Sequence, residues 1–191
     1  ARGGRRPQVR RIPGLEAMAE AVGRATELGR PVFFVPGVRD LDNVQTVAGL
    51  AVFEHAAALT ARHACELLVP TDRSLVLAAA REIGRDAYTA AGRADGWRDD
   101  RVVYVSDDQF GFAARVDGLI ARERPAACFY FGFFAAESLL IAEAGQQAGA
   151  IQVAGTAERS QLPFFVAACD YTLIGEELFA ASACLTGDPA L

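Results

Sequence analysis

Nine acidic side chains follow the predicted strands of this sequence within a few residues, and they are the residues best suited to chemistry. Only three basic residues, Arg39, Arg73 and Arg159, occur in the same short segments. Carboxylate oxygens from several loops are the hard ligands that suit Mg²⁺ or a similar divalent cation. The acids are Asp40, Asp42, Asp72, Asp107, Asp108, Glu137, Glu158, Glu176 and Glu177.

The same acids have a second interpretation, which we favour: they stabilise the starts of helices. Each predicted helix begins at this edge of the sheet, where the positive end of the helix dipole favours carboxylates without any ligand. No catalytic residue and no cofactor are therefore predicted, although a divalent cation would suit the crevice that these acids line. The candidate ligand-binding residues are Asp40, Asp42, Asp72, Asp107, Asp108, Glu137, Ser138, Thr156 and Glu176.

Several other chemistries lack the residues that they need. The chain contains no lysine, which excludes Schiff-base and P-loop lysines. Its two histidines, His55 and His63, lie on one predicted helix about 12 Å apart along the axis, and neither follows a strand. A catalytic triad therefore has no suitable base. No glycine-rich GxGxxG loop follows a strand, so the usual dinucleotide fingerprint is missing too.

Charge and cysteine usage narrow the class of protein further. The net charge is −5, although residues 1–30 carry seven Arg against three Glu. The acidic remainder of the chain argues against a nucleic-acid partner. The four cysteines are widely spaced and form no CxxC pair, which favours reduced core residues over a disulfide framework or a zinc site.

The elements that must position the acids are strands and helices in alternation. The segment 126–131 is an uninterrupted apolar run between a proline and a glycine, which is typical of a strand buried on both faces. Five more candidate strands, three before this segment and two after it, occur at the spacing of βα units, with helical patterns between them. We predict a single α/β, Rossmann-like, doubly wound and mostly parallel sheet of about six strands, with helices on both faces. The predicted strands are 32–35, 65–69, 101–105, 126–131, 150–153 and 170–174. The predicted helices are 15–28, 44–63, 72–91, 107–122, 135–148, 161–168 and 176–185.

Three helix starts carry residues that predict capping. Ser106 and Gln109 have the spacing of a capping box, as do Asp42 and Gln45, and Thr71 precedes a helix that we expect from Asp72. Residues 1–13 are rich in Arg, Gly and Pro and predict a basic, flexible lead-in to a single domain over 14–191. Such a segment also suits the cytoplasmic side of a membrane, where basic residues face anionic lipid.

Four longer motifs resemble an uncharacterised bacterial domain that is found in membrane-anchored proteins. The similarity covers about residues 28–191 and implies a soluble domain beside membrane helices outside this chain. We therefore expect a piece of a longer protein at the cytoplasmic face of a bacterial membrane. The motifs are residues 36–46, 106–110, 135–140 and 161–177.

Two functions fit these observations. The leading hypothesis is a non-enzymatic, membrane-tethered α/β domain that self-associates as a homo-oligomer or scaffolds a membrane-protein assembly. The alternative is a domain that binds a small molecule or divalent cation in the acidic crevice and that could be an enzyme.

Overall fold

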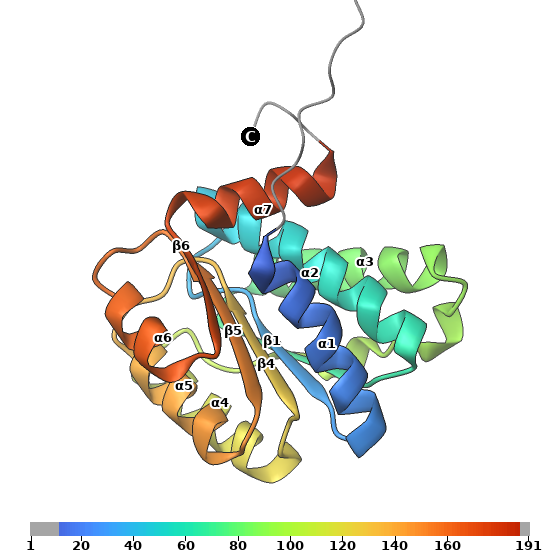
Figure 1. The fold of residues 1–191 in the computed structure, drawn as a ribbon, viewed down its shortest axis with the longest axis horizontal. Helices are drawn as coiled ribbons and strands as arrows, with labels where there is room; N and C mark the ends of the chain where they lie inside the picture. The colour runs from blue at the N-terminus through green and yellow to red at the C-terminus, as the bar shows by residue number, and fades with distance from the viewer. Residues whose placement is uncertain (1–11, 188–191) are drawn as a thin grey trace, which may run out of the picture.

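The computed structural model describes residues 12–187, which form one sheet of six parallel strands covered by helices on both faces (Figure 1). The strand order is β3-β2-β1-β4-β5-β6. This arrangement confirms the predicted fold class, and it adds the strand order, which local sequence patterns do not provide. The strands are β1 Val32–Val35, β2 Leu67–Thr71, β3 Val102–Tyr104, β4 Ala127–Phe131, β5 Ile151–Thr156 and β6 Tyr171–Ile174.

Seven α-helices divide into two layers. The sheet separates α1, α2, α3 and α7 from α4, α5 and α6, and each layer encloses its own hydrophobic core against the sheet (Figure 1). Two 3₁₀ turns, Ala94–Gly96 and Asp99–Arg101, lead into β3. The helices are α1 Pro13–Leu28, α2 Val44–His63, α3 Ser74–Ala90, α4 Gln109–Glu123, α5 Glu137–Gln147, α6 Leu162–Ala168 and α7 Glu176–Thr186.

Strand β4 lies near the middle of the sheet and joins the two cores. Because successive side chains of a strand point to opposite faces, Phe129 and Phe131 pack into one core while Cys128 and Tyr130 pack into the other. Every residue of the strand is buried. An apolar run without alternation is therefore what this position requires, as the sequence predicted.

Helix α2, with 20 residues, is the longest helix in residues 12–187, and most of its residues are apolar. In residues 12–187 it is the one helix whose length and composition would allow it to cross a membrane, and 61% of that apolar stretch is buried inside the protein. The helix packs between α1, α3, α7 and the sheet. Its composition is thus accounted for by a core position, in which a helix needs apolar residues on most sides.

Most predicted boundaries agree with the structure within two residues, and those of β1 and α2 agree at both ends. The strand predicted at 65–69 is shifted by two residues at both ends. The exception is the strand predicted at 150–153, because β5 continues to Thr156, three residues beyond the predicted end. Of the predicted lead-in, residues 1–11 lie outside the described residues, and Pro13 already belongs to α1.

Candidate functional site

The strand order reverses between β1 and β4, and this reversal defines the candidate site. Strands β2 and β3 extend from one side of β1, whereas β4, β5 and β6 extend from the other side. Ligands of open α/β sheets bind beyond the carboxyl ends of the strands at such a reversal. The site to examine is therefore the space between residues 36–43, which follow β1, and residues 132–136, which follow β4.

The two loops close on each other at this point. The backbone N–H of Val38 donates to the carbonyl oxygen of Phe133 at 2.8 Å. A Cβ atom on Gly37 would lie 2.7 Å from that same oxygen, and one on Gly132 would lie 2.9 Å from the carbonyl oxygen of Pro36. Both glycines have positive φ angles, +79° and +136°. The glycines thus let two segments of backbone meet, where in a nucleotide-binding loop they would let backbone meet a phosphate.

Further packing covers the same space. Gly49 of α2 lies directly against the carbonyl oxygen of Phe131, leaving no room for a Cβ atom. On the outer side, the guanidinium carbon of Arg39 lies 4.8 Å from the ring centroid of Phe133, within the range of a cation–π contact. At the strand reversal, the loops after β1 and β4 are therefore held against each other by contacts between backbone groups.

Asp72, directly after β2, is the most unusual of the predicted site residues. It is 4% exposed, and its Oδ1 atom has no hydrogen-bond partner among the described residues. Its Oδ2 atom lies 3.4 Å from Nε of Arg73. The pKa of Asp72 is raised to about 6, mainly by burial. The negative charges of Glu137 and Asp40 contribute to the rise, whereas the positive charge of Arg73 opposes it. Asp40 and Glu137 are therefore near enough to Asp72 for their charges to act on its carboxyl group.

Glu137, the first residue of α5, is fully buried, but the chain itself occupies both of its oxygens. Oε1 accepts from the backbone N–H of Ala135 at 2.5 Å, and Oε2 accepts from the side-chain amide of Gln109 at 2.6 Å. These two bonds compensate for the burial of the carboxylate. They link the starts of α4 and α5, so the arrangement supports the helix-start interpretation of this acid.

Ser138 and Thr156 are buried and join different parts of the same edge. Ser138 donates to the side-chain oxygen of Gln161 at 2.8 Å. Thr156, at the end of β5, donates to the side-chain oxygen of Gln45 at 3.3 Å and accepts from the backbone N–H of Glu158 at 3.1 Å. None of these hydrogen bonds involves Asp72. The hydroxyl groups of Ser138 and Thr156 therefore bond within the protein at other points of this edge.

Other predicted acids either accept hydrogen bonds from backbone groups nearby in the sequence or are exposed. Asp40 accepts from the backbone N–H of Leu41 at 2.8 Å, and Asp108 accepts from that of Gly111 at 2.6 Å. Asp42, Asp107 and Glu176 are exposed. Within residues 12–187, no three acidic, histidine or cysteine side chains are arranged to hold a metal ion.

The predicted capping contacts differ from the observed ones. Asp108 caps α4 in place of Ser106, because the side chain of Gln109 reaches Glu137 and does not turn back on its own helix. Asn43 caps α2 in place of Asp42, because Gln45 instead accepts from the backbone N–H of Ala157 at 2.8 Å.

Thr71 also does not cap a helix as predicted. It lies within β2 and donates to the carbonyl oxygen of Val103 at 3.3 Å. Helix α3 begins later than predicted, at Ser74, and no side chain caps it.

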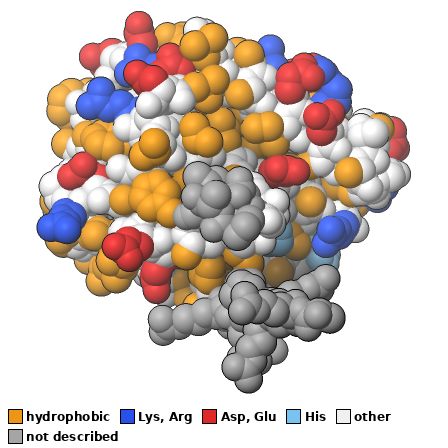
Figure 2. Space-filling model, turned by 90° about the horizontal axis from the view of Figure 1, so that it is seen from above, with side chains coloured by type: hydrophobic (Ala, Val, Ile, Leu, Met, Phe, Trp, Pro, Cys, Tyr) orange, Lys and Arg blue, Asp and Glu red, His pale blue; other side chains and the backbone are white. Residues whose placement is uncertain are grey.

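A surface that the sequence analysis missed lies where α7 crosses the start of α2. A hollow of about 200 Å³, which we call the α2–α7 hollow, opens there between mostly apolar side chains. Val44 and Val47 are 69% and 49% exposed. Figure 2 looks down on this edge of the molecule and shows hydrophobic side chains gathered among acidic ones. The hollow is lined by Leu41, Asp42, Val44, Val47, Ala48, Phe179 and Ser182.

The signal for this surface is present in the sequence but ambiguous. Helix α2 has apolar residues around most of its circumference, so periodicity cannot separate Val44 and Val47 from buried positions such as Val52 and Phe53. Only the position of α7, set by the fold, shows which side of α2 remains uncovered.

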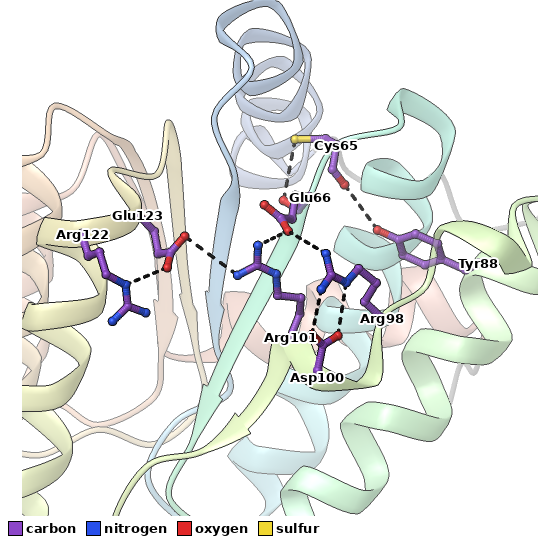
Figure 3. Close-up of polar contacts among 8 residues, drawn as sticks. All are labelled: Cys65, Glu66, Tyr88, Arg98, Asp100, Arg101, Arg122 and Glu123. Atoms are coloured by element: carbon purple, nitrogen blue, oxygen red, sulfur yellow. Dashed lines mark hydrogen bonds and ion pairs between the residues drawn. The ribbon is translucent and has the colours of Figure 1, made fainter.

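The opposite edge of the sheet carries a connected group of ion pairs (Figure 3). Glu66, just before β2, contacts Arg101 and lies 4.0 Å from Arg98. Arg101 also lies 3.9 Å from Glu123 at the end of α4. Arg98 pairs with Asp100 at 2.8 Å. Arg122 lies 2.9 Å from Glu123, so three arginines balance three acids. These contacts connect the starts of β2 and β3 with α4 far from the strand reversal, which indicates a structural role.

Comparison with known proteins identifies the family of the chain. No curated protein and no solved structure matches it. One family model matches the whole chain, residues 1–191, and is described as a domain of unknown function, DUF6754. The chain therefore belongs to the DUF6754 family.

Proposed function

We propose that this chain is a non-enzymatic α/β domain that self-associates and thereby helps to build a larger assembly. The observation that carries the proposal is the α2–α7 hollow, with Val44 projecting beside it. A hollow of about 200 Å³ is large enough for an aliphatic side chain, since a cavity of about 150 Å³ accepts benzene. The loop contact at the strand reversal supports the same choice, because backbone meets backbone where a nucleotide-binding loop would leave room for a phosphate.

The surface has the features of a contact between identical copies. In a two-fold interface, one patch meets the same patch of the partner, so a projection and a hollow must lie side by side on each copy. Val44 and the α2–α7 hollow meet this requirement, and Asp42 is the one charged residue that lines the hollow. In the proposed dimer, Val44 of each copy enters the hollow of the other.

Sedimentation equilibrium over micromolar concentrations tests this contact. Val47→Asp should dissociate the oligomer while the fold is retained, because an acid in the first turns of a helix is compatible with the helix dipole. Val166→Asp on α6 is the matched control, since Val166 is 55% exposed and lies on the other face of the sheet. A native chain that stays monomeric, or equal effects of the two substitutions, would overturn the proposal.

We further propose that the domain lies at the cytoplasmic face of a bacterial membrane, tethered by segments outside this chain. Residues 1–13 support this placement, because their five arginines suit the side of a membrane that carries anionic lipid. Flotation with vesicles tests the contribution of this segment. Binding should require phosphatidylserine and should weaken when Arg5 and Arg6 are changed to Glu; equal flotation with neutral vesicles would contradict it.

One observation favours the alternative of a bound cation or small molecule. Oδ1 of buried Asp72 has no hydrogen-bond partner among the described residues, and the negative charges of Asp40 and Glu137 act on this carboxyl group against the positive charge of Arg73. If this group binds a ligand, Mg²⁺, Mn²⁺ or a cationic metabolite should raise the melting temperature of the native protein. Asp72→Asn and Glu137→Gln should each abolish the rise. No rise with any of these probes would leave self-association as the only proposed function.

A further inference from the structure

We propose that the groove between α4 and α5 binds a basic amphipathic helix presented by another protein. This α4–α5 groove lies on the opposite face of the sheet from the α2–α7 hollow, so it offers a second, independent surface (Figure 1). The inference goes beyond self-association, because it assigns a heterologous partner and its chemistry. The main hollow of the α4–α5 groove has a volume of about 470 Å³. It is lined by Phe110, Ala113, Ala114, Asp117, Leu140, Glu143, Ala144 and Gln147.

The dimensions of the groove suit a helix. A smaller hollow of about 190 Å³ continues it, sharing Asp117 and Ala144 and ending at Arg124. From Phe110 to Arg124 the groove follows α4 for about 21 Å, at a rise of 1.5 Å per residue. That length corresponds to about four turns of a partner helix lying along α4 and α5.

The floor and the walls of the groove differ in character. Alanines form most of the floor, which lets a partner helix approach closely. At one end, Phe110 and Leu140 are 63% and 45% exposed and offer apolar contact. Such an arrangement matches helix-in-groove recognition, in which apolar side chains spaced three and four residues apart enter an apolar channel.

The charges of the groove select a basic partner. Asp117 and Glu143 stand on its two walls, and both side chains are exposed. The basic residue Arg124 lies only at the far end. Complementary charge steers association and disfavours partners of the wrong sign. A helix with Arg or Lys beside its apolar stripe therefore fits, and an acidic helix does not.

Gly118 lies on α4 beside the groove, next to the lining residues Ala114, Asp117 and Ala121, and leaves room for a close partner there. It lies between Ala114 and Ala121 at spacings of four and three residues, which places all three on one helix face. A Cβ atom on Gly118 would contact nothing within 4 Å, so packing within the chain does not require glycine there. A glycine inside a helix costs stability relative to alanine, and close approach of a second helix would account for it.

The chain's own basic segment is a poor match for this partner. Residues 1–11 are rich in arginine, but they contain Gly3, Gly4 and Pro7 and only one branched apolar residue, Val9. That composition lacks the apolar stripe of an amphipathic helix. The partner helix is therefore expected from another protein.

Fluorescence anisotropy with a labelled synthetic peptide tests the proposal on the whole chain. The probe is a 14-residue amphipathic helix with Leu and Ala on one face and Arg on the other, and its control carries Glu in place of Arg. The Arg peptide should bind about tenfold or more tightly than the Glu peptide. Equal binding of the two peptides, or no binding of either, would overturn the proposal.

Variants locate the binding to the groove. The double substitution Asp117→Arg and Glu143→Arg should reverse the preference between the peptides, whereas Asp86→Arg on α3 should leave it unchanged. Gly118→Leu should abolish binding while the circular dichroism spectrum keeps its helical signal. If Gly118→Leu leaves binding intact, or if the groove variants dissociate an oligomer of this chain, the occupant is not the proposed helix.

These results are separable from the test of self-association. Val47→Asp lies on the other face of the sheet and should not change peptide binding. Loss of the oligomer with peptide binding retained would support the two surfaces separately, and each proposal can fail alone.

Discussion

The indole ring of Trp97 lies directly against Gly84 of α3, so closely that a Cβ atom on Gly84 would overlap the ring. The ring also contacts Tyr88, with centroids 5.2 Å apart. The loop between α3 and β3 is thus held on α3 by its tryptophan, and the contact depends on the missing side chain of the glycine.

Gly84→Ala should therefore lower the free energy of unfolding by about 1–3 kcal/mol, the usual cost of overpacking. Urea unfolding followed by the fluorescence of Trp97, the only tryptophan in the chain, measures the change directly. Gly118→Ala is the matched control, since its added methyl meets open space within α4. It should stabilise the protein by about 0.5–1 kcal/mol. A stabilising Gly84→Ala would show that the ring moves aside at no cost.

Gly37→Ala should disrupt the contact that closes the strand reversal. The new Cβ atom would lie 2.7 Å from the carbonyl oxygen of Phe133 on a backbone with φ of +79°. Strain and overpacking together predict a loss of about 2–4 kcal/mol in the free energy of unfolding.

Gly29→Ala is the control for backbone strain alone, because Gly29 also has positive φ, +61°, but nothing lies within 4 Å of an added Cβ. Its cost should be about 1–2 kcal/mol. If both variants lose the same free energy of unfolding, the close approach of the two loops does not contribute.

Asp72 should make stability depend on pH. Its pKa in the folded protein is about 6, above its ordinary value of 3.8, so folding favours the protonated form. The contribution of protonated Asp72 to stability is complete below about pH 4 and is lost as the pH rises through 6. The free energy of unfolding should fall by up to about 3 kcal/mol over this range. Asp72→Asn should therefore be more stable than the native protein at pH 8, and the two should be similar at pH 4.

Chemical unfolding at a series of pH values measures this difference. Asp86→Asn removes an exposed carboxylate from α3 and should keep the pH dependence of the native protein. A native curve that stays flat between pH 4 and pH 7 would contradict the role assigned to Asp72.

The ion pairs at the opposite edge should stabilise the fold only modestly. Glu66→Gln weakens the contacts of Glu66 with Arg98 and Arg101, and both partners retain a second acid, Asp100 or Glu123. The expected loss is about 0.5–1 kcal/mol in low salt, and it should shrink in 1 M NaCl, where exposed charges are screened. Unfolding in urea at both salt concentrations checks this, because urea itself is uncharged. A loss that is unchanged by salt would indicate a packing role for Glu66.

The sequence was sufficient for the elements and the fold class because those depend on local patterns. The apolar run before Gly132 predicted a buried strand, and β4 is buried throughout. The segment Val44–His63 was predicted as a helix with both boundaries correct. Both patterns, a short apolar run bounded by Pro and Gly and a long apolar segment, lie within one stretch of sequence, so neighbouring residues alone carry the information.

The details of the site depended on contacts between distant segments. Gln109 and Glu137 are far apart in the sequence, so the spacing that suggested a capping box could not show that Gln109 bonds elsewhere. Likewise, Gly37 looks like an ordinary turn residue until the loop around Phe133 is placed beside it. The candidate acids were recognised by type, but only the fold separates Asp72, which is buried and lacks a partner for one oxygen, from Asp108, which caps a helix.

Helix α2 has a consequence for how the protein is made. It emerges early during synthesis, but α7, which covers its start, is the last helix of the described chain. Until α7 emerges from the ribosome, a twenty-residue apolar helix is incompletely covered. To the machinery that inserts membrane proteins, such a helix is difficult to distinguish from a true span. We therefore expect the core position of α2 to become secure only when α7 has been synthesised and has packed against it.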